Sequence, residues 1–187
     1  MRQSACACGS DPRVRVLDFG CGRVMTYFRD LQSALLYGTD IDEQAIAWCK
    51  ENLAEFASFT VNSEWPPLPF EDGFFDLIFS VSIFTHLPEK MQIAWLEELR
   101  RLSKPGALVL LSVHGEHHLP GNARKRLVQA GFLYLTGHSA EGLPDFYQMT
   151  YHTERYIIEH WGKFFQIEAI LKRGINDLQD LVVCRSR

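Results

Sequence analysis

The sequence has little of several features that would direct a protein to a membrane, a secretory route or a charged polymer. Its 187 residues include 19 Lys and Arg against 23 Asp and Glu, so the net charge is −4 and no overall positive field attracts nucleic acid or anionic lipid. Apolar runs such as Ala107 to Val113 are far shorter than a membrane span, and Met1 to Ser4 lead into no apolar core of a secretory signal. We therefore expect a cytoplasmic protein with neither nucleic acid nor a membrane as partner.

Paired cysteines are also lacking. The five cysteines are odd in number and scattered along the chain: Cys6, Cys8, Cys21, Cys49 and Cys184. Cys6 and Cys8 are separated by one residue, which suits neither an easy disulfide nor the two-residue gap of a zinc knuckle. Reduced thiols in a reducing compartment are the expected state.

No repeat, low-complexity stretch or linker interrupts the chain. With 47% hydrophobic and 22% charged residues it resembles an ordinary globular protein, and its length suits one domain. We expect a single domain over residues 1–187, with a short N-terminal extension over 1–13.

Strand-like and helix-like stretches alternate in the first two thirds of the chain. The predicted strands cover residues 14–17, 35–39, 59–61, 75–80 and 107–113. Between them, helical spacing is found from Met25 through Phe28 and Leu31 to Leu35, after Asp42 as N-cap, and over 89–103. Continuous apolar strands separated by amphipathic helices predict a parallel sheet covered on both faces.

The pattern is looser after His114. We expect a helix over 122–130, a polar and aromatic loop over 137–149, and a helix capped by Thr153 that ends near Trp161. Two further strands, 164–171 and 181–184, are joined by about ten residues, too few for a helical crossover, so they should be antiparallel.

A glycine turn follows the first strand at Asp18, Gly20 and Gly22. Such a turn lets the backbone approach a ligand closely, although it also occurs for purely structural reasons. Asp40, at the end of the second strand, is placed to accept hydrogen bonds from both hydroxyls of a ribose. Alternatively, Asp40 caps the next helix together with Asp42, but we assign the cap to Asp42 and the ribose to Asp40.

At this point the sequence resembles the class I S-adenosylmethionine-dependent methyltransferases, of the type 11 and type 25 kind. The resemblance depends on five motifs in order: Val16 to Gly22, Gly38 to Asp42, Leu68 to Ile78, Thr85 to Leu87, and Glu98 to Gly106. It implies a Rossmann-like, doubly wound, mostly parallel seven-stranded sheet with an antiparallel last strand. The C-terminal part, less specifically, resembles bacterial members linked to polysaccharide modification.

The resemblance also implies which residues hold the cofactor, S-adenosyl-L-methionine. Asp18, Gly20, Cys21 and Gly22 would surround its methionine part. Asp40 would hold the ribose, Ile41 would lie against the adenine, and Asn62 with Ser63 would reach the adenine edge. Ser80 and Val81 would line the methyl end.

The glycine turn departs from the pattern, because Val24 stands where the family has its third glycine. The turn is therefore tighter or bulkier than usual, which motivates a second hypothesis: a methyltransferase-like fold that no longer catalyses and serves as a binding or scaffold protein. A nicotinamide oxidoreductase ranks last, because the turn also lacks the last glycine of Gly-x-Gly-x-x-Gly.

Histidines are the candidate general bases for an oxygen or nitrogen acceptor. His114 and His117 follow the fifth strand at the ligand edge and are the first choices. With Glu116 and His118 they also suggest a metal site or a solvated loop, and we assign no metal. His86 is interpreted as structural, and Arg124 to Arg126 as a solvated helix face.

The predicted function is methyl transfer to an oxygen or nitrogen of a small-molecule or glycan-like acceptor. Only residues 1–13 precede the first strand, so we expect the segment 114–153 to cover the site, helped by a second subunit if the chain forms a homodimer. Tyr134, Phe146, Tyr147 and Tyr151 in this segment could line an acceptor pocket or belong to the core.

Overall fold

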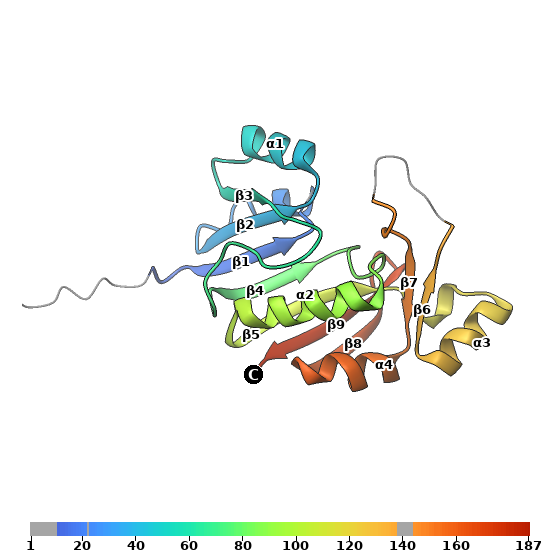
Figure 1. Ribbon diagram of the computed structural model, residues 1–187. Coiled ribbons are helices and arrows are strands. Elements are labelled where there is room, and N and C mark those ends of the chain that lie inside the picture. Colours follow the sequence, from blue (N-terminus) through green and yellow to red (C-terminus); the bar gives the residue numbers. More distant parts are fainter. Residues whose placement is uncertain (1–10, 22, 138–143) are drawn as a thin grey trace, which may run out of the picture.

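The computed structural model describes residues 11–21, 23–137 and 144–187 (Figure 1). The elements follow in the order β1 (Val14–Phe19), η1 (Arg23–Phe28), β2 (Ala34–Asp40), α1 (Glu43–Asn52), β3 (Ala57–Val61), β4 (Phe75–Ser80), α2 (Glu89–Leu102), β5 (Ser103–Val113), η2 (Glu116–His118), α3 (Gly121–Ala130), β6 (Phe132–Leu135), β7 (Met149–His152), α4 (Glu154–His160), η3 (Trp161–Lys163), β8 (Phe165–Ile175) and β9 (Gln179–Ser186). No helix within these described ranges is long and apolar enough to cross a bilayer.

The main sheet has seven strands in the order β3-β2-β1-β4-β5-β9-β8. β1 pairs in parallel with β2 and β4, and β4 with β5, whereas β9 is antiparallel to both β5 and β8. The predicted fold class, a Rossmann-like α/β sheet with an antiparallel strand near one edge, is confirmed.

Both faces of the sheet are covered, because successive side chains of a strand point to opposite sides. Leu17 and Phe19 of β1 belong to a core cluster with side chains of α2 and α4, while Val16 belongs to a second cluster with α1 and Met25 of η1. Figure 1 shows α2 and α4 in front of the strands. The helices therefore bury the two apolar faces that the strand sequences present.

The segment after β1 differs from the prediction. The apolar spacing from Met25 to Leu35 predicted an α-helix, and this was wrong: the chain forms the short 3-10 helix η1. Met25 is fully buried, but Leu31 is 47% exposed and Leu35 belongs to β2. Four apolar residues at helical spacing thus reflect one turn against the core followed by a strand.

A second difference lies on the two sides of the predicted loop 137–149, where no strands were predicted. Phe132–Leu135 and Met149–His152 pair as an antiparallel two-stranded sheet, β6 and β7. Each strand has four residues, too few for a period-two pattern to stand out from a loop. α3 packs on this hairpin through Leu127, Leu133 and Tyr151.

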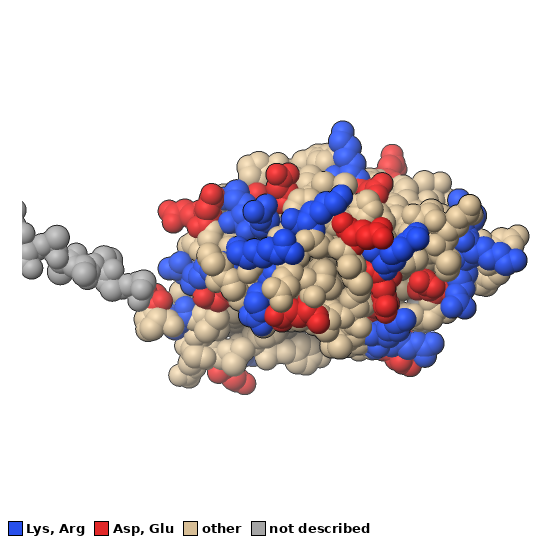
Figure 2. Space-filling model, turned by 90° about the horizontal axis from the view of Figure 1, so that it is seen from below, with Lys and Arg blue, Asp and Glu red and all other residues tan. Residues whose placement is uncertain are grey.

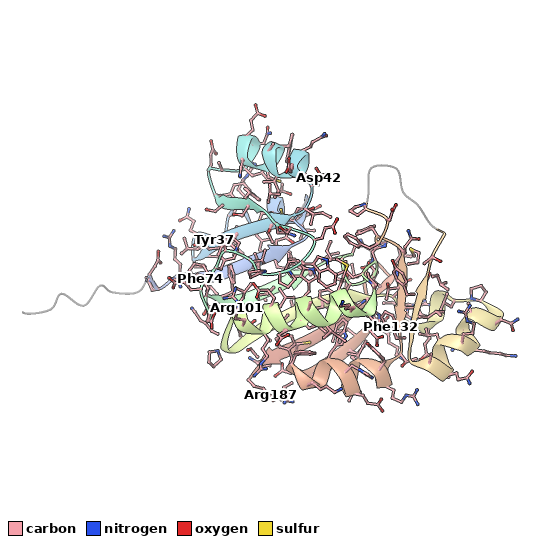
Figure 3. All side chains as sticks on the ribbon, in the orientation of Figure 1. Tyr37, Asp42, Phe74, Arg101, Phe132 and Arg187 are labelled. Atoms are coloured by element: carbon pink, nitrogen blue, oxygen red, sulfur yellow. The ribbon has the colours of Figure 1, made fainter. Side chains whose placement is uncertain are left out.

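A buried ion pair connects α2 to the proline-rich loop before β4. Glu98 is 6% exposed, and its Oε1 accepts hydrogen bonds from the Leu68 backbone N–H and from Arg101 Nη2, each at 2.7 Å. Arg101 also donates to the Phe70 carbonyl at 2.9 Å and to Asp72 at 2.6 Å (Figure 3).

We expect Arg101→Met to lower the free energy of unfolding by about 2 kcal/mol, because it leaves the buried Glu98 carboxylate without its cation. Urea denaturation measures this effect. Arg100→Met, on the exposed side of the same helix, is the matched control and should change stability by no more than about 0.5 kcal/mol. Equal effects of the two substitutions would contradict a structural role for the pair.

Candidate active site

A cavity of about 740 Å³ lies at the carboxyl ends of β1, β2 and β4. Its lining comes from the strand ends, the start of α1, the loops before and after β4, α2 and the segment that precedes β7: Phe19, Gly20, Asp40, Ile41, Asp42, Glu43, Gln44, Ala45, Asn62, Glu64, Ile83, Leu87, Trp95, Pro144, Phe146 and Tyr147. This is the edge at which open α/β sheets bind ligands.

Strand register brings the polar groups of one wall together. Asp40 is opposite Val61 in the parallel pair of β2 and β3, so Asn62 follows directly beside it, and the Asn62 backbone N–H donates to the Asp40 carbonyl at 2.9 Å. Asn62 Oδ1 accepts from Thr39 Oγ1 at 2.7 Å, and Nδ2 donates to the Ser63 carbonyl at 2.8 Å. The amide is therefore fixed in one orientation.

The glycine turn after β1 allows the closest backbone approach to the cavity. Gly20 has φ +85°, in the left-handed region, and its N–H donates to the Thr39 carbonyl at 2.8 Å. A Cβ atom at Gly20 would lie 2.2 Å from Ile83 Cγ1, so a side chain cannot occupy this place without displacing the opposite wall.

Carboxylates dominate the charge of the cavity. Asp40, Asp42, Glu43 and Glu64 line it, and none of its described lining residues is Lys, Arg or His. Burial raises the pKa of the Asp40 carboxyl above its ordinary value of 3.8. Burial and the charge of Asp40 together raise the pKa of Tyr147 to about 12. The field favours a cationic or neutral ligand and opposes a pyrophosphate, which argues against a dinucleotide.

Asp42 performs the local task predicted for it. Its Oδ1 accepts from the backbone N–H groups of Gln44 at 2.8 Å and Ala45 at 3.0 Å, and so caps α1 (Figure 3). Its own N–H donates to Asp40 Oδ1 at 3.0 Å. Asp42 therefore caps the helix while Asp40 lines the cavity, and Asp40 Oδ2 takes part in none of these hydrogen bonds.

His86 lies in the loop between β4 and α2, next to the cavity residue Leu87. Its ring stacks on Tyr147 with centroids 4.0 Å apart, and Nδ1 is 2.8 Å from the Gln148 carbonyl. Because a carbonyl only accepts, Nδ1 carries the proton and Nε2 keeps its lone pair. Nε2 has no hydrogen-bond partner among the described residues, and it is not a buried atom, so a ligand can reach it. Burial lowers the pKa of His86 below 6.5.

Ser82 fixes the same loop in a strained conformation that the sequence does not signal. Its φ of 63° lies in the left-handed region, which a non-glycine residue rarely adopts. The Ser82 N–H donates to Ser112 Oγ at 2.8 Å, Gln179 Nε2 donates to Ser82 Oγ at 2.8 Å, and the Tyr147 hydroxyl donates to its carbonyl at 3.0 Å. These three bonds hold Ile83 and His86 against the cavity.

The structure brings together only part of the predicted cofactor set. Gly20, Asp40, Ile41 and Asn62 line the cavity. Asp18 and Cys21 are buried beneath it, Ser80 is buried within β4, and Val81 packs against the second core cluster. Ser63 is exposed outside the cavity, and Gly22 lies outside the described residues. Val24, at the position of the missing third glycine, packs against the second cluster.

The two predicted bases are separated. The His114 ring lies 6.1 Å from the His86 ring and 5.2 Å from Tyr151, between centroids, but does not line the cavity. His117 lies in a second cavity of about 210 Å³, with Nε2 3.4 Å from Asp180 Oδ1. His86, interpreted from the sequence as structural, is the histidine beside the first cavity. Its partners are more than sixty residues away, so local sequence held no signal for its position.

The fold is that of a doubly wound α/β domain, with a carboxylate and a glycine turn at the strand ends that border the cavity. The methyltransferase domain family matches residues 17–111, half of the chain, and the chain belongs to that family. The predicted class, a domain of the S-adenosylmethionine-dependent methyltransferases, is confirmed, as is that cofactor.

Three known proteins illustrate the range of relatives. A tRNA N(3)-cytidine methyltransferase of Gallus gallus is 29% identical over 59% of this chain and 33% of its own length. A tRNA N(3)-methylcytidine methyltransferase of Schizosaccharomyces pombe is 28% identical over 92% of this chain and 56% of its own. The 1,6-didemethyltoxoflavin-N1-methyltransferase of Burkholderia thailandensis, solved with 1,6-didemethyltoxoflavin and S-adenosylhomocysteine, has a TM-score of 0.68 at 18% identity, covering 93% and 71% of the two chains.

These relatives overturn one prediction. Nucleic acid was excluded as a partner because the net charge is −4, and that exclusion is wrong: two similar curated proteins are tRNA methyltransferases. Net charge describes the whole surface, whereas binding depends on where the cations lie. The chain spans about a third to just over half the length of these two relatives.

Proposed function

We propose that the protein transfers a methyl group from S-adenosylmethionine to a ring nitrogen of a pyrimidine base in RNA. The observation that carries the first half is the carboxylate-lined cavity at the end of β2, which attracts a sulfonium cation and is bordered by the Gly20 turn. The tRNA cytidine methyltransferases among the relatives support the acceptor. The bound cofactor would supply an electrophilic methyl group on a positively charged sulfur.

The residues present fit such a cofactor. Asp40 Oδ2 would accept hydrogen bonds from the ribose hydroxyls of the cofactor, and Asn62 and Ile41 would contact its adenine at the same end of the cavity. The absence of a side chain at Gly20 lets Ile83 pack directly against the turn at this wall of the cavity. Phe19 and Trp95, whose ring centroids are 4.6 Å apart, form an apolar wall that excludes water from the opposite side.

The described parts of the segment 114–153 would cover the acceptor side. Pro144, Phe146 and Tyr147 line the cavity, and the Tyr134 hydroxyl donates to the Phe146 carbonyl at 2.7 Å. Aromatic side chains at this place provide a stacking surface for a planar base. Positioning of the nucleophile opposite the methyl group accounts for much of the rate in a displacement of this kind.

The proposed base is His86: when the lone pair of cytosine N3 takes the methyl group and the C–S bond breaks, the nucleobase becomes a cation, and the neutral Nε2 would accept a proton from its exocyclic N4–H. His114 and His117 were predicted for this role; His86 is favoured because its ring stacks on the cavity residue Tyr147 and its Nδ1–H bond to the Gln148 carbonyl leaves Nε2 as the acceptor. Its lowered pKa keeps the ring neutral at pH 7, as proton acceptance requires.

Calorimetric titration of S-adenosylmethionine and S-adenosylhomocysteine into the purified protein tests the cofactor site. The acceptor is tested by transfer of a labelled methyl group to a cytidine-containing RNA hairpin, with free cytidine and a sugar as comparison acceptors. The sugar addresses the resemblance to polysaccharide-modifying members, which stays a prediction. If neither S-adenosylmethionine nor S-adenosylhomocysteine binds, the proposal is contradicted and the scaffold hypothesis is favoured.

We expect His86→Gln to lower the rate of methyl transfer about 100-fold with cofactor affinity unchanged, since general bases contribute about 10²- to 10⁴-fold. In the wild type, the rate should fall as the pH drops through a midpoint below 6.5, because protonation of Nε2 removes its lone pair. This acid limb should disappear in the variant. His114→Gln and His117→Gln are the comparison variants, and loss of the limb in one of them instead would reassign the base.

A further inference from the structure

The helix α3 carries basic residues and no acidic ones. No Asp or Glu occurs between Glu116 and Glu141, and this stretch contains Arg124, Lys125 and Arg126. All three are exposed on α3, and in the described part of the chain none of them forms an ion pair. In Figure 2, Lys and Arg side chains gather at the end of the molecule where α3 lies.

Several cations elsewhere on the molecule are neutralised by ion pairs. Arg101 contacts Glu98 and Asp72, Lys104 contacts Asp76, and Arg185 contacts Glu168. The cations on α3 have no such carboxylate partners among the described residues and are therefore available to bind an anionic partner.

α3 is connected to the cofactor cavity by a continuous set of contacts. Leu127 anchors the helix on the β6–β7 hairpin. β7 is in turn fixed to the loop after β4: Thr150 donates from N to the Thr85 carbonyl at 2.8 Å and from Oγ1 to the Leu87 carbonyl at 2.9 Å. The residues just before β7 line the cavity. One unit thus presents aromatic rings to the cavity and cations to solvent.

The charges of the two regions are complementary in function. The cavity is lined by carboxylates and repels phosphate, so an RNA that inserts a base there must have its backbone held elsewhere. Proteins that bind single-stranded nucleic acid combine aromatic surfaces for the bases with cations along the backbone. α3 has the cations that the cavity lacks.

We propose that Arg124, Lys125 and Arg126 form a docking surface for the phosphate backbone of single-stranded RNA whose base enters the cavity. This inference rests on the proposed function for its choice of acceptor. The surface ends at Arg124, because the second cavity that this residue lines also contains the carboxylates of Glu116, Glu154 and Asp180. Phosphate contacts of this kind position the strand without reading its sequence.

The test measures binding of a fluorescein-labelled RNA hairpin with cytidine in its loop, by fluorescence anisotropy, to the full chain saturated with S-adenosylhomocysteine. The variant R124Q/K125Q/R126Q is compared with K50Q/R100Q/K163Q, which removes the same charge from exposed positions on α1, α2 and η3. We expect the α3 variant to bind at least about tenfold more weakly and the control to stay within about twofold. The slope of log affinity against log salt should be smaller in magnitude by about 2, since each single-strand phosphate contact contributes about 0.7.

Two results would overturn the proposal: equal losses in the two triple variants, or no RNA binding by the wild type. Vesicles containing phosphatidylserine are tested in parallel, and binding to them without binding to RNA would make the surface a lipid contact. The cofactor titration on the same proteins separates the two proposals. If S-adenosylmethionine binds and RNA does not, the docking surface alone is wrong, whereas loss of cofactor binding contradicts the proposed function itself.

Discussion

Asp40→Asn is expected to weaken S-adenosylmethionine binding about 100-fold, equivalent to about 2.7 kcal/mol. A carboxylate that accepts from hydroxyls makes charge-assisted hydrogen bonds, each worth about 1.5–3 kcal/mol, and the amide replaces one of its oxygens by a donor. Asn keeps Oδ1, so the bond from the Asp42 N–H and the turn that leads into α1 are preserved. Calorimetry of the two cofactor forms measures the effect.

The matched control for Asp40 is Glu43→Gln. Glu43 lines the same cavity but belongs to the first turn of α1 and is exposed. Its substitution removes the same charge from the cavity and should change affinity by no more than about threefold, because exposed charges are screened. If both variants lose affinity equally, the cavity acts only through its overall field, and Asp40 has no specific contact.

Gly20→Ala is expected to abolish measurable cofactor binding, a loss of more than about 100-fold, and to lower stability by about 2 kcal/mol. The new methyl group would lie 2.2 Å from Ile83 Cγ1, and Gly20 has φ +85°, where a non-glycine residue is strained by about 1–2 kcal/mol. Displacement of Ile83 would push the cavity wall inward. Calorimetry and urea denaturation together separate the two effects.

Gly106→Ala isolates the backbone strain. Gly106 has φ +80° with no atom within 4 Å of the added Cβ, and it does not line the cavity. This variant should lose comparable stability and keep full cofactor affinity. In Gly20→Ala/Ile83→Ala the clash is relieved but the strain remains, so part of the binding should return. Normal affinity in Gly20→Ala would show that the turn does not contact the cofactor.

The sequence predicted those parts of the site that depend on strand ends. Asp40 and Asn62 terminate neighbouring parallel strands, so their proximity follows from the order of strands alone. The family resemblance placed Ser80 and Val81 at the methyl end of the cofactor; in the structure the chain runs on to Ser82 before it turns, and Ile83 lines the cavity. The turn depends on bonds from Ser112 and Gln179, which no local pattern could reveal.

The acceptor side was the harder part to predict. The strands β6 and β7 on either side of the predicted loop 137–149 were not predicted, and the His86 ring is oriented by Gln148, which directly precedes β7. The exclusion of nucleic acid, which was also wrong, was based on the net charge of the whole chain. The distribution of charge between a carboxylate-lined cavity and α3 becomes visible only when the chain is folded.

The position of β9 has a consequence for the route of folding. β9 lies between β5 and β8 in the described sheet, although it follows β8 in sequence. β8 is therefore connected to the rest of the sheet only through β9. The two strands are joined by residues 176–178, so they can form a hairpin early, by local contacts at low loop-closure cost. The sheet is then completed by the docking of a preformed pair, and the free edge of β5 stays open to wrong partners until that step.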